Sequence, residues 1–294
     1  MGLSTIIITQ LLAGLSRASV LFLLSSGLSL IFGVNKVIAF THGSLYVLTM
    51  YISFTLATKM TTLLFGFWLS LLLAPLCVAA VATLLEVVFF RRVYDKEHLM
   101  QLVLAMGLVY VLGDVTKFIW GPLPKTIGMP DGFTGSVRAA GIIVPSYYLL
   151  VIAAGAATAL SLWATIQKTS FGRRIRASAA DPNMAKALGV NVSAIKTAIF
   201  ALGSFMAGFA GALNLPLSSA SLGADAEATV LAFIIVIIGG AGSIMGTFVA
   251  ALIVGIVDSF GILVVPRFAI VVIYLVMVVV LLVRPYGIFG KVTQ

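Results

Sequence analysis

The sequence is poor in the residues that build catalytic and metal-binding sites. Its 294 residues include one cysteine, two histidines and nine acidic residues. Cys77 lies within an apolar run, which excludes a disulfide framework and a cysteine-based metal site. With only His42 and His98, no cluster of histidine, cysteine and carboxylate side chains marks a hydrolase or a metalloenzyme. The sequence also lacks a Gly-x-x-x-x-Gly-Lys-Ser/Thr phosphate loop, so we expect no enzyme activity and no ATP hydrolysis from this chain alone.

Charge is also scarce, whereas hydrophobic residues are abundant. Only 9% of the residues are charged, 61% are hydrophobic, and the mean hydropathy is +1.19. A water-soluble domain of this composition could not cover its surface with polar groups, so its solvent is lipid. The apolar runs are continuous rather than alternating, which argues against a β-barrel. The sequence therefore predicts an all-α, polytopic helical membrane protein with a single transmembrane domain over residues 1–294.

About eight to nine membrane segments are predicted. A bilayer core about 30 Å thick takes roughly 20 apolar residues per helix. The run at 226–239 is short for a crossing and meets the next run through a glycine-rich turn at 239–243. This pattern predicts a short or broken helix pair near the C-terminus, supported by protein or by a water-filled cavity. The runs of suitable or nearly suitable length are 7–33, 38–58, 63–90, 99–120, 146–167, 194–215, 226–239, 244–260 and 262–283.

The basic residues predict how the chain is oriented in the membrane. Most of the 18 lysines and arginines fall in short loops that can share one side, and such loops stay cytoplasmic. We therefore expect the C-terminus inside and the N-terminus outside. The basic residues are spread over several loops rather than gathered in one stripe with aromatic partners, so we expect no nucleic-acid partner.

A polar loop at 168–191 separates two predicted membrane helices and carries helix signals of its own. Asp181 and Pro182 form an N-cap and first-turn pattern, and Gly189 is a C-terminal stop. We expect a short helix from Pro182 to Leu188, preceded by a basic helical stretch at 171–180. Small side chains let another surface approach, and the arginines can pair with acidic groups or lipid phosphates. The alternative is a solvated basic loop that only sets topology. The residues expected to contact a partner are Arg173, Arg174, Ala179, Ala180, Asp181, Ala185 and Gly189.

Charges within the apolar runs are functional candidates because each is costly in lipid. Asp114 and Lys117 lie three residues apart on one predicted helix and can form a structural ion pair. Arg17 either snorkels outward or faces a polar cavity and meets an anionic group. His42 can bind freed backbone groups near a helix start or contact a solute. We expect Asp258 near a helix end, where it reaches the interface.

Small residues predict close helix packing and also mark candidates for a translocation path. Glycines spaced along one face allow helix backbones to approach each other. A packing role alone and a role in the path are both open at this point, because the two often coincide in a helical transporter. The path candidates are Arg17, Gly27, Gly33, His42, Gly43, Gly239, Gly240 and Gly242.

Three segments resemble the permease subunits of the branched-chain amino-acid ABC importer family. They are the loop at 171–191, the glycine-rich segment at 27–34 followed by Ala39-Phe-Thr-His-Gly-Ser-Leu-Tyr, and Gly239-Gly-Ala-Gly-Ser-Ile-Met-Gly. Their order and spacing agree with the family from about residue 10 to residue 290. Two features depart from it: Ala39 and Thr41 replace the Asn and Ala of the family signature, and Arg17 lies within the first helix. The resemblance is therefore specific to the family but not to a solute.

The resemblance implies the permease subunit of an ATP-binding-cassette importer in a bacterial inner membrane. The solute would be a branched-chain or other amino acid, or a related small carboxylate or amide. The implied partners are a homologous second permease, two cytoplasmic ATPase subunits that bind ATP and Mg, and an extracytoplasmic solute-binding protein. This chain would bind no cofactor, and its loop at 168–191 would couple it to the ATPase.

The alternative is an autonomous secondary carrier or channel. An ion-driven carrier would want buried carboxylates near broken helices at the middle of the membrane. We expect Asp225 and Glu227 at the outer end of the short helix, which favours the importer.

Overall fold

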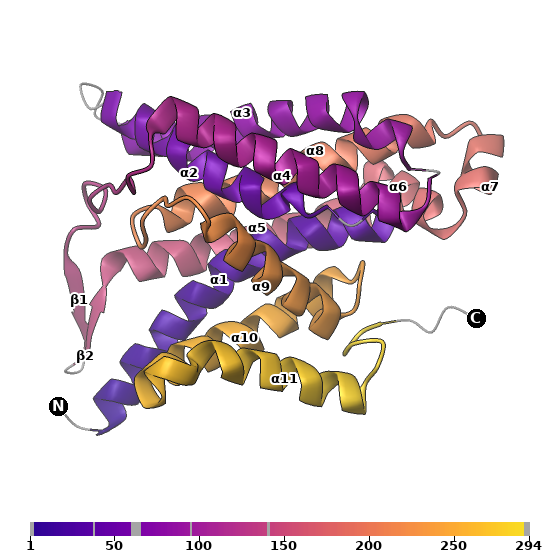
Figure 1. The fold of residues 1–294 in the computed structure, drawn as a ribbon. Helices are drawn as coiled ribbons and strands as arrows, with labels where there is room; N and C mark the ends of the chain where they lie inside the picture. The colour runs from indigo at the N-terminus through magenta and orange to yellow at the C-terminus, as the bar shows by residue number, and fades with distance from the viewer. Residues whose placement is uncertain (1–2, 38, 60–65, 95, 140–141, 291–294) are drawn as a thin grey trace.

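The computed structural model describes residues 3–37, 39–59, 66–94, 96–139 and 142–290. It is almost entirely helical, as the composition predicted (Figure 1). Two short helices, α6 (Ser170–Ala180) and α7 (Pro182–Ala187), connect two long ones. The long helices are α1 (Leu3–Asn35), α2 (Thr41–Lys59), α3 (Gly66–Val88), α4 (His98–Trp120), α5 (Ser146–Lys168), α8 (Val192–Asn214), α9 (Ala224–Gly239), α10 (Ile244–Val264) and α11 (Ala269–Val283).

Seven helices of the described ranges are long and apolar enough to cross a membrane, namely α1, α3, α4, α5, α8, α10 and α11. The two other long helices, α2 and α9, are among the better-buried ones. Most of the first half of α2 is buried, including its polar residues Thr41, His42 and Ser44. α9 has only 16 residues, and more than half of them are buried. Because protein surrounds both helices, they need neither the length nor the apolar composition of a lipid-facing span.

The C-terminal helices differ in two ways from the expected broken pair. α9 is short, as predicted, but α10 has 21 residues and is long enough to span the membrane. The predicted boundary near residue 261 is also wrong, since α10 continues through Gly261 to Val264 and a 3-10 turn at Pro266–Phe268 precedes α11. A proline lacks the N–H group that a helix interior needs, whereas a single glycine is tolerated there. The first residues of the predicted segment 63–90 lie outside the described ranges.

A small β-hairpin that the sequence analysis did not predict lies before α5. Its strands β1 (Ser136–Ala139) and β2 (Ile142–Pro145) are antiparallel, with Ser136 opposite Pro145 and Val137 opposite Val144. Figure 1 shows the hairpin at the same end of the bundle as the N-terminus, while α6, α7 and the end of α11 lie at the opposite end. The two ends of the bundle therefore differ in structure, with a hairpin at one and two short helices at the other.

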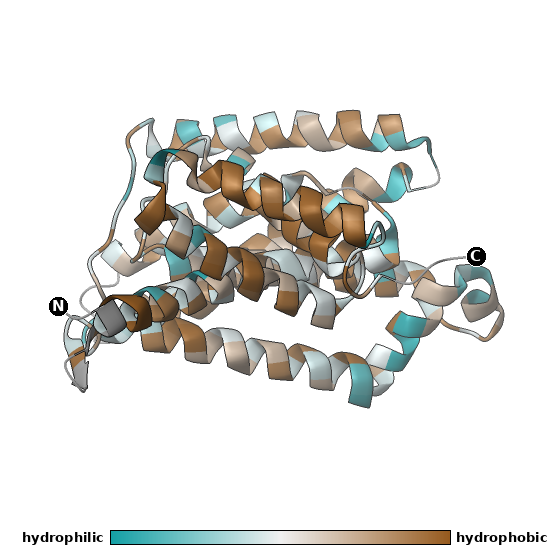
Figure 2. Ribbon diagram, turned by 90° about the horizontal axis from the view of Figure 1, so that it is seen from below, coloured by the Kyte–Doolittle hydropathy of each residue, from teal (hydrophilic) through white to brown (hydrophobic). Residues whose placement is uncertain are grey.

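The outer faces of the bundle are apolar, as expected for contact with lipid. Hydrophobic residues run along the helices, and hydrophilic ones gather mostly toward the helix ends (Figure 2). α4 exposes Val103, Tyr110 and Phe118, and α11 exposes Leu275 and Leu282. The core, by contrast, contains many small and polar residues. Helices in lipid associate through close packing and interhelical hydrogen bonds rather than through hydrophobic burial, which accounts for this arrangement.

α1 is the central helix of the bundle, and it packs against α5, α8, α9 and α10. One close approach is to α8, where Gly27 faces Gly203. A Cβ atom built on Gly203 would lie 2.7 Å from both the Gly27 carbonyl oxygen and Cγ1 of Ile31. Only glycine fits here, because part of the obstacle is the backbone of α1 itself. This contact fixes the spacing of α1 and α8.

We predict that Gly203→Ala lowers the stability of the folded chain by about 1–3 kcal/mol, the usual cost of overpacking a core. The measurement is the thermal unfolding midpoint of the purified variant in detergent. Gly107→Ala on α4 is the matched control, because nothing lies within 4 Å of the added Cβ there. The control should unfold at or above the wild-type temperature, since alanine favours helix over glycine. An equal loss in both variants would contradict the packing argument.

Candidate functional site

The helices α6 and α7 form a protrusion at one end of the bundle (Figure 1). The turn from α5 into α6 is tight, because a Cβ atom on Gly172 would collide with the carbonyl oxygens of Thr165 and Ile166. Thr169 caps α6 by accepting a hydrogen bond from the Gly172 amide at 3.0 Å. Arg176 donates a further hydrogen bond to the Ile166 carbonyl. These contacts hold α6 at a fixed angle to α5.

α7 is capped at both ends as the sequence predicted. One carboxylate oxygen of Asp181 accepts hydrogen bonds from the amides of Asn183 and Met184, at 2.9 and 3.0 Å. At the other end, Gly189 has φ +81° and the Val190 amide donates to the Ala185 carbonyl at 3.0 Å. Positive φ costs glycine nothing, which is why glycine is common after a helix end. The short helix is therefore defined by local sequence.

The residues predicted to contact a partner divide into exposed and inward-facing ones. Ala185 is only 2% exposed and packs against the bundle, so it is not available to a partner in this conformation. Ala179 is partly buried. The protrusion also exposes two large apolar residues that the sequence analysis did not single out, Met184 at 59% and Leu188 at 76%. The exposed predicted residues are Arg173, Arg174, Ala180, Asp181 and Gly189.

The glycines predicted to line a path lie in close contacts between backbones. A Cβ atom on Gly27 would meet the Gly203 backbone, and one on Gly33 would lie 2.7 Å from the Cα of Gly242. Gly43 faces Asp225 and Thr229 at the start of α9. Gly239 faces Gly246 across the turn between α9 and α10, and Gly240 has φ +94° in that turn. Close packing accounts for these positions, and a role in the path stays a prediction.

His42 is positioned by the backbone of α1. It is 1% exposed, and its Nε2 lies 2.8 Å from the Leu24 carbonyl oxygen. Leu24 lies well inside α1, so α2 begins in the interior of the bundle rather than at its end. α9 begins in the interior as well, because Asp225 in its first turn accepts a hydrogen bond from Ser44 at 3.0 Å. Asp225 and Glu227 lie in the first turn of α9, at the end of the short helix where they were expected, and the side of the membrane that this end faces stays a prediction.

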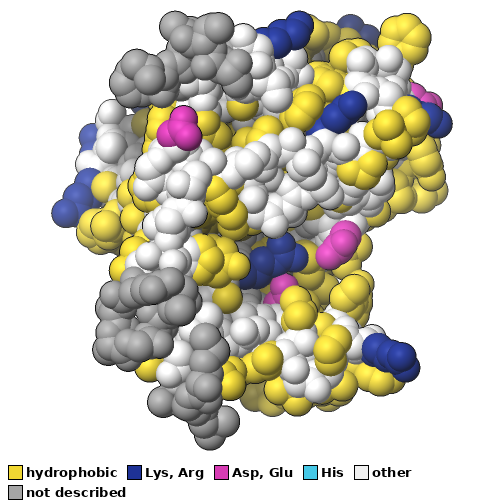
Figure 3. Space-filling model, turned by 90° about the vertical axis from the view of Figure 1, so that its left-hand side faces the viewer, with side chains coloured by type: hydrophobic (Ala, Val, Ile, Leu, Met, Phe, Trp, Pro, Cys, Tyr) yellow, Lys and Arg dark blue, Asp and Glu magenta, His cyan; other side chains and the backbone are white. Residues whose placement is uncertain are grey.

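Arg17 forms an ion pair with Asp258 on α10, and its Nε lies 3.0 Å from Oδ2 of the carboxylate. The Arg17 side chain is 34% exposed, whereas that of Asp258 is 10% exposed. The expectation that Asp258 reaches the interface is wrong, because α10 extends past it to Val264 and buries the carboxylate. At this end of the molecule a hollow contains basic and acidic side chains side by side (Figure 3).

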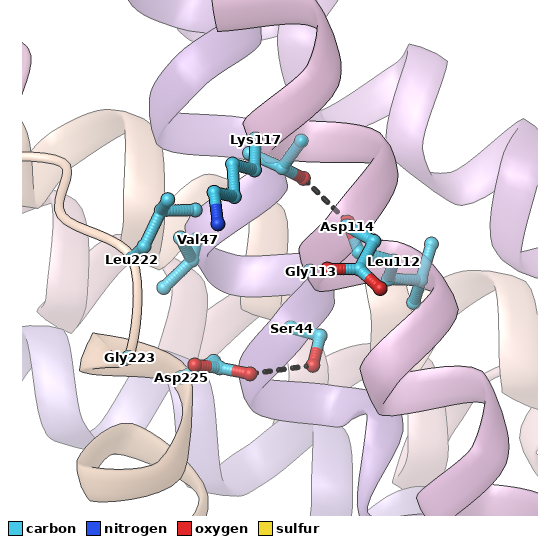
Figure 4. Close-up of a pocket in the computed structure, with 10 residues that line it drawn as sticks. Ser44, Val47, Leu112, Gly113, Asp114, Lys117, Leu222, Gly223 and Asp225 are labelled. Atoms are coloured by element: carbon cyan, nitrogen blue, oxygen red, sulfur yellow. Dashed lines mark hydrogen bonds between the residues drawn. The ribbon is translucent and has the colours of Figure 1, made fainter. Parts of the chain in front are cut away.

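A second polar region lies between α2, α4 and α9, around a cavity of about 240 Å³. Ser44, Asp114, Lys117 and Asp225 contribute its polar side chains (Figure 4). The predicted ion pair between Asp114 and Lys117 is wrong. The ion pairs within 4 Å among the described residues are Arg17–Asp258 and Arg91–Glu86, so the two α4 charges face the cavity without a charged partner.

A buried carboxylate at the other end of the bundle was missed by the sequence analysis. Glu86, at 0% exposed, accepts hydrogen bonds from Tyr94 at 2.9 Å and from Thr197 at 2.8 Å. Arg91 lies 3.4 Å from the same carboxylate and donates to Thr197 at 2.6 Å. Burial, assisted by Glu86, raises the pKa of the Tyr94 hydroxyl, which keeps it a donor. The available signal was a lone acidic residue inside the apolar run 63–90.

This network joins elements that are distant in sequence. Asn35 at the end of α1 donates to the Tyr94 hydroxyl at 3.2 Å and to the Lys196 carbonyl at 3.3 Å. The Lys196 ammonium lies over the Tyr94 ring, 4.6 Å from its centroid. Thr197 and Lys196 lie on the first turns of α8, directly after α7. The ends of α1, α3 and α8 are thus tied together next to the α6–α7 protrusion. Among the residues the structure describes, no group of His, Cys, Asp and Glu is arranged to hold a metal.

Comparisons with known proteins agree with these features. Residues 10–281 match the family described as branched-chain amino acid transport system, permease component. The chain is 27% identical over 292 residues to the high-affinity branched-chain amino acid transport system permease protein BraD of Pseudomonas aeruginosa, with 96% of this chain and 95% of that protein covered. The corresponding protein LivH of Escherichia coli is 27% identical over 300 residues, with the same coverage.

A sugar permease is similar over part of the chain. The ribose import permease protein RbsC of Haemophilus influenzae is 29% identical over 161 residues, which cover 51% of this chain and 48% of that protein. No solved structure matches the chain. The similarity thus extends over nearly full length to permeases named for branched-chain amino acids.

We predict that Arg17→Ala destabilises the chain by about 1–3 kcal/mol, between the values for exposed and buried ion pairs. The cost arises because Asp258 stays buried without its partner. Asp258→Ala should cost less, since the half-exposed Arg17 can reach water. Thermal unfolding of both single variants and the double variant in detergent measures the interaction energy between Arg17 and Asp258. The double variant should be more stable than Arg17→Ala, and simple addition of the two losses would contradict the pairing.

Proposed function

The chain belongs to the family of permease components of branched-chain amino acid transport systems, as its sequence motifs predicted, and we propose that it forms the membrane path of an ATP-driven importer. Its partners would be a homologous second permease, two ATPase subunits that bind ATP and Mg, and an extracytoplasmic solute-binding protein. This chain would contribute the path and the surface that receives the ATPase, and it would bind no cofactor.

The protrusion formed by α6 and α7 carries this proposal. It is held rigidly on α5 and exposes basic residues beside Met184 and Leu188. A loop that only sets membrane topology needs neither capped helices nor exposed apolar side chains. A docking surface for a soluble subunit needs exposed apolar side chains, which supply affinity, and a charged rim, which supplies orientation. Capped helices hold these side chains in place.

The orientation follows from the same feature. Basic residues are abundant at the end of the bundle that holds the protrusion, and the end of α11 lies there too (Figure 1). We assign this end to the cytoplasm of a bacterial cell, with the inner membrane around the bundle. The N-terminus and the β-hairpin would then face outside, where a solute-binding protein delivers its cargo.

The packing suggests how movement would pass from the ATPase to the path. A two-state switch needs an element whose two arrangements are biased by the ligand, here ATP on the partner. The protrusion continues directly into α5 and α8, and α8 contacts α1 backbone to backbone at Gly203. A shift of the protrusion would therefore move α8, and α1 would have to follow or separate from it.

We propose a small solute for this path, namely a branched-chain or other amino acid or a related small carboxylate or amide. The names of the relatives and the permease architecture support amino acids. Arg17 supports a solute with a carboxylate less strongly than the sequence suggested, because Asp258 already neutralises the charge of Arg17. The separate cavity beside α4 retains charges without partners in this chain.

One observation favours the alternative of an autonomous carrier. Asp225 is a partly buried carboxylate in the first turn of the short helix α9, and ion-driven carriers build their ion and substrate sites at short or broken helices. The decisive difference between the two proposals is the presence of an ATPase partner.

The first test is purification of the tagged chain in mild detergent, with the accompanying proteins identified by mass spectrometry. An importer subunit should bring an ATPase and a second permease in stable stoichiometry. Purification as a folded oligomer of this chain alone would overturn the importer proposal and favour the carrier.

The second test is Asp181→Arg, which removes the cap of α7 and reverses a charge on the protrusion. We expect normal membrane insertion, loss of solute uptake, and ATPase activity that no longer responds to the loaded binding protein. Gly189→Pro should act similarly, because it blocks the turn after α7. Asp181→Asn is the matched control and should leave coupling largely intact, because asparagine also caps helix N-termini. Wild-type uptake and stimulation in both Asp181→Arg and Gly189→Pro would contradict the coupling role.

A further inference from the structure

The cavity between α2, α4 and α9 combines features that a lipid-facing surface would not retain. It measures about 240 Å³, the volume of roughly eight water molecules at about 30 Å³ each, so one small molecule fits inside. Asp114 and Lys117 enter it from α4, and Ser44 and Asp225 lie on the opposite side (Figure 4). Its apolar lining comes from Val47, Leu112 and Leu222.

The two α4 charges that line this cavity, Asp114 and Lys117, form no ion pair within the described part of the chain. Both residues are exposed. Asp225 uses one carboxylate oxygen to accept the Ser44 hydrogen bond, and its second oxygen is not engaged in this contact. The ordinary interhelical hydrogen bonds of the bundle do not require such groups. Lys117 lies in the last turn of α4 and Asp114 one turn before it, and a charge on a membrane helix is costly unless it meets water or a charged ligand.

The arrangement of these charges selects one class of ligand. Figure 4 shows the Lys117 ammonium approaching the cavity from one side and the carboxylates of Asp114 and Asp225 from others. A simple anion would meet two carboxylates, and a simple cation would meet the ammonium. A small molecule with one charge of each sign can satisfy both, and it would place its apolar part against Val47 and Leu222.

We propose that this cavity is a binding site for a zwitterionic solute during its passage, with Lys117 holding the carboxylate and Asp114 and Asp225 holding the ammonium. The assignment rests on the proposed transport function and adds the residues and the chemistry that recognise the solute within the membrane. The site lies beside the interior starts of α2 and α9, so movement of either helix would open or close it.

The test measures protection of a cysteine in the cavity. Cys77 is the only cysteine of the chain, so Cys77→Ser gives a cysteine-free background in which Leu222→Cys reports on the cavity. The full-length chain, with whatever subunits accompany it, is placed in nanodiscs and treated with a charged, water-soluble thiol reagent. L-leucine should slow the labelling at least about fivefold, while leucinamide and 4-methylpentanoate, each lacking one charge, should not. Asp131→Cys, in an exposed loop, should label at the same rate with or without leucine.

A charge variant then assigns the carboxylate contact. Lys117→Gln in the reporter background should raise the leucine concentration for half-protection by about 10- to 100-fold, the usual effect of losing a charged hydrogen bond. Lys125→Gln is the matched control, because Lys125 does not line the cavity and instead lies over the Phe54 ring. An equal effect of both lysine variants would overturn the assignment.

The remaining outcomes are equally decisive. Absence of labelling at Leu222→Cys would show a cavity closed to water, and labelling that leucine does not slow would show a cavity that is no solute site. Equal protection by leucinamide would remove the role of Lys117. Each of these results leaves the importer proposal standing, because that proposal is decided by the co-purifying subunits and not by protection in the cavity.

Discussion

The contact between the backbones of α1 and α8 at Gly27 and Gly203 determines the geometry of the rest of the molecule. Because Gly27 has no side chain, α8 can approach α1 and the His42 ring of α2 also fits beside it, where a Cβ atom on Gly27 would lie 3.0 Å from Cε1 of His42. α1 also packs against α5, α9 and α10, so the position of nearly every inner helix is set relative to it. In lipid, where hydrophobic burial does not drive helices together, such steric fit is a main source of cohesion.

Polar contacts supplement this fit at three depths of the bundle. Arg17 and Asp258 connect α1 to α10 toward one end, Ser44 and Asp225 connect α2 to α9 in the interior, and the Glu86 network connects α1, α3 and α8 at the other end. Each contact joins helices far apart in sequence. Since a buried charge without its partner is costly, each contact also fixes which helices are neighbours.

Local features could be predicted from the sequence, whereas relations between distant segments could not. The caps of α7 and the presence of the apolar helices depend on neighbouring residues, so Asp181, Gly189 and the hydrophobic runs were sufficient for these features. The partner of Arg17 and the interior start of α9 depend on three-dimensional packing. The predicted Asp114–Lys117 ion pair is wrong because helical spacing permits a contact without requiring one. Both side chains turn toward the cavity instead. Glu86 was missed because one acidic residue in an apolar run carries no information about its hydrogen-bond donors.

The interior starts of α2 and α9 have a consequence for how the protein is made. Neither helix has both the length and the apolar composition to enter lipid as an independent span, and polar groups at their starts bond to other helices, His42 to α1 and Asp225 to α2. α2 packs against α3, α4, α8 and α9, so none of these neighbours has been made when α2 itself is translated. The first helices therefore enter the membrane before the helices that cover their buried faces have been made. Completion of the bundle depends on the order in which its helices are translated.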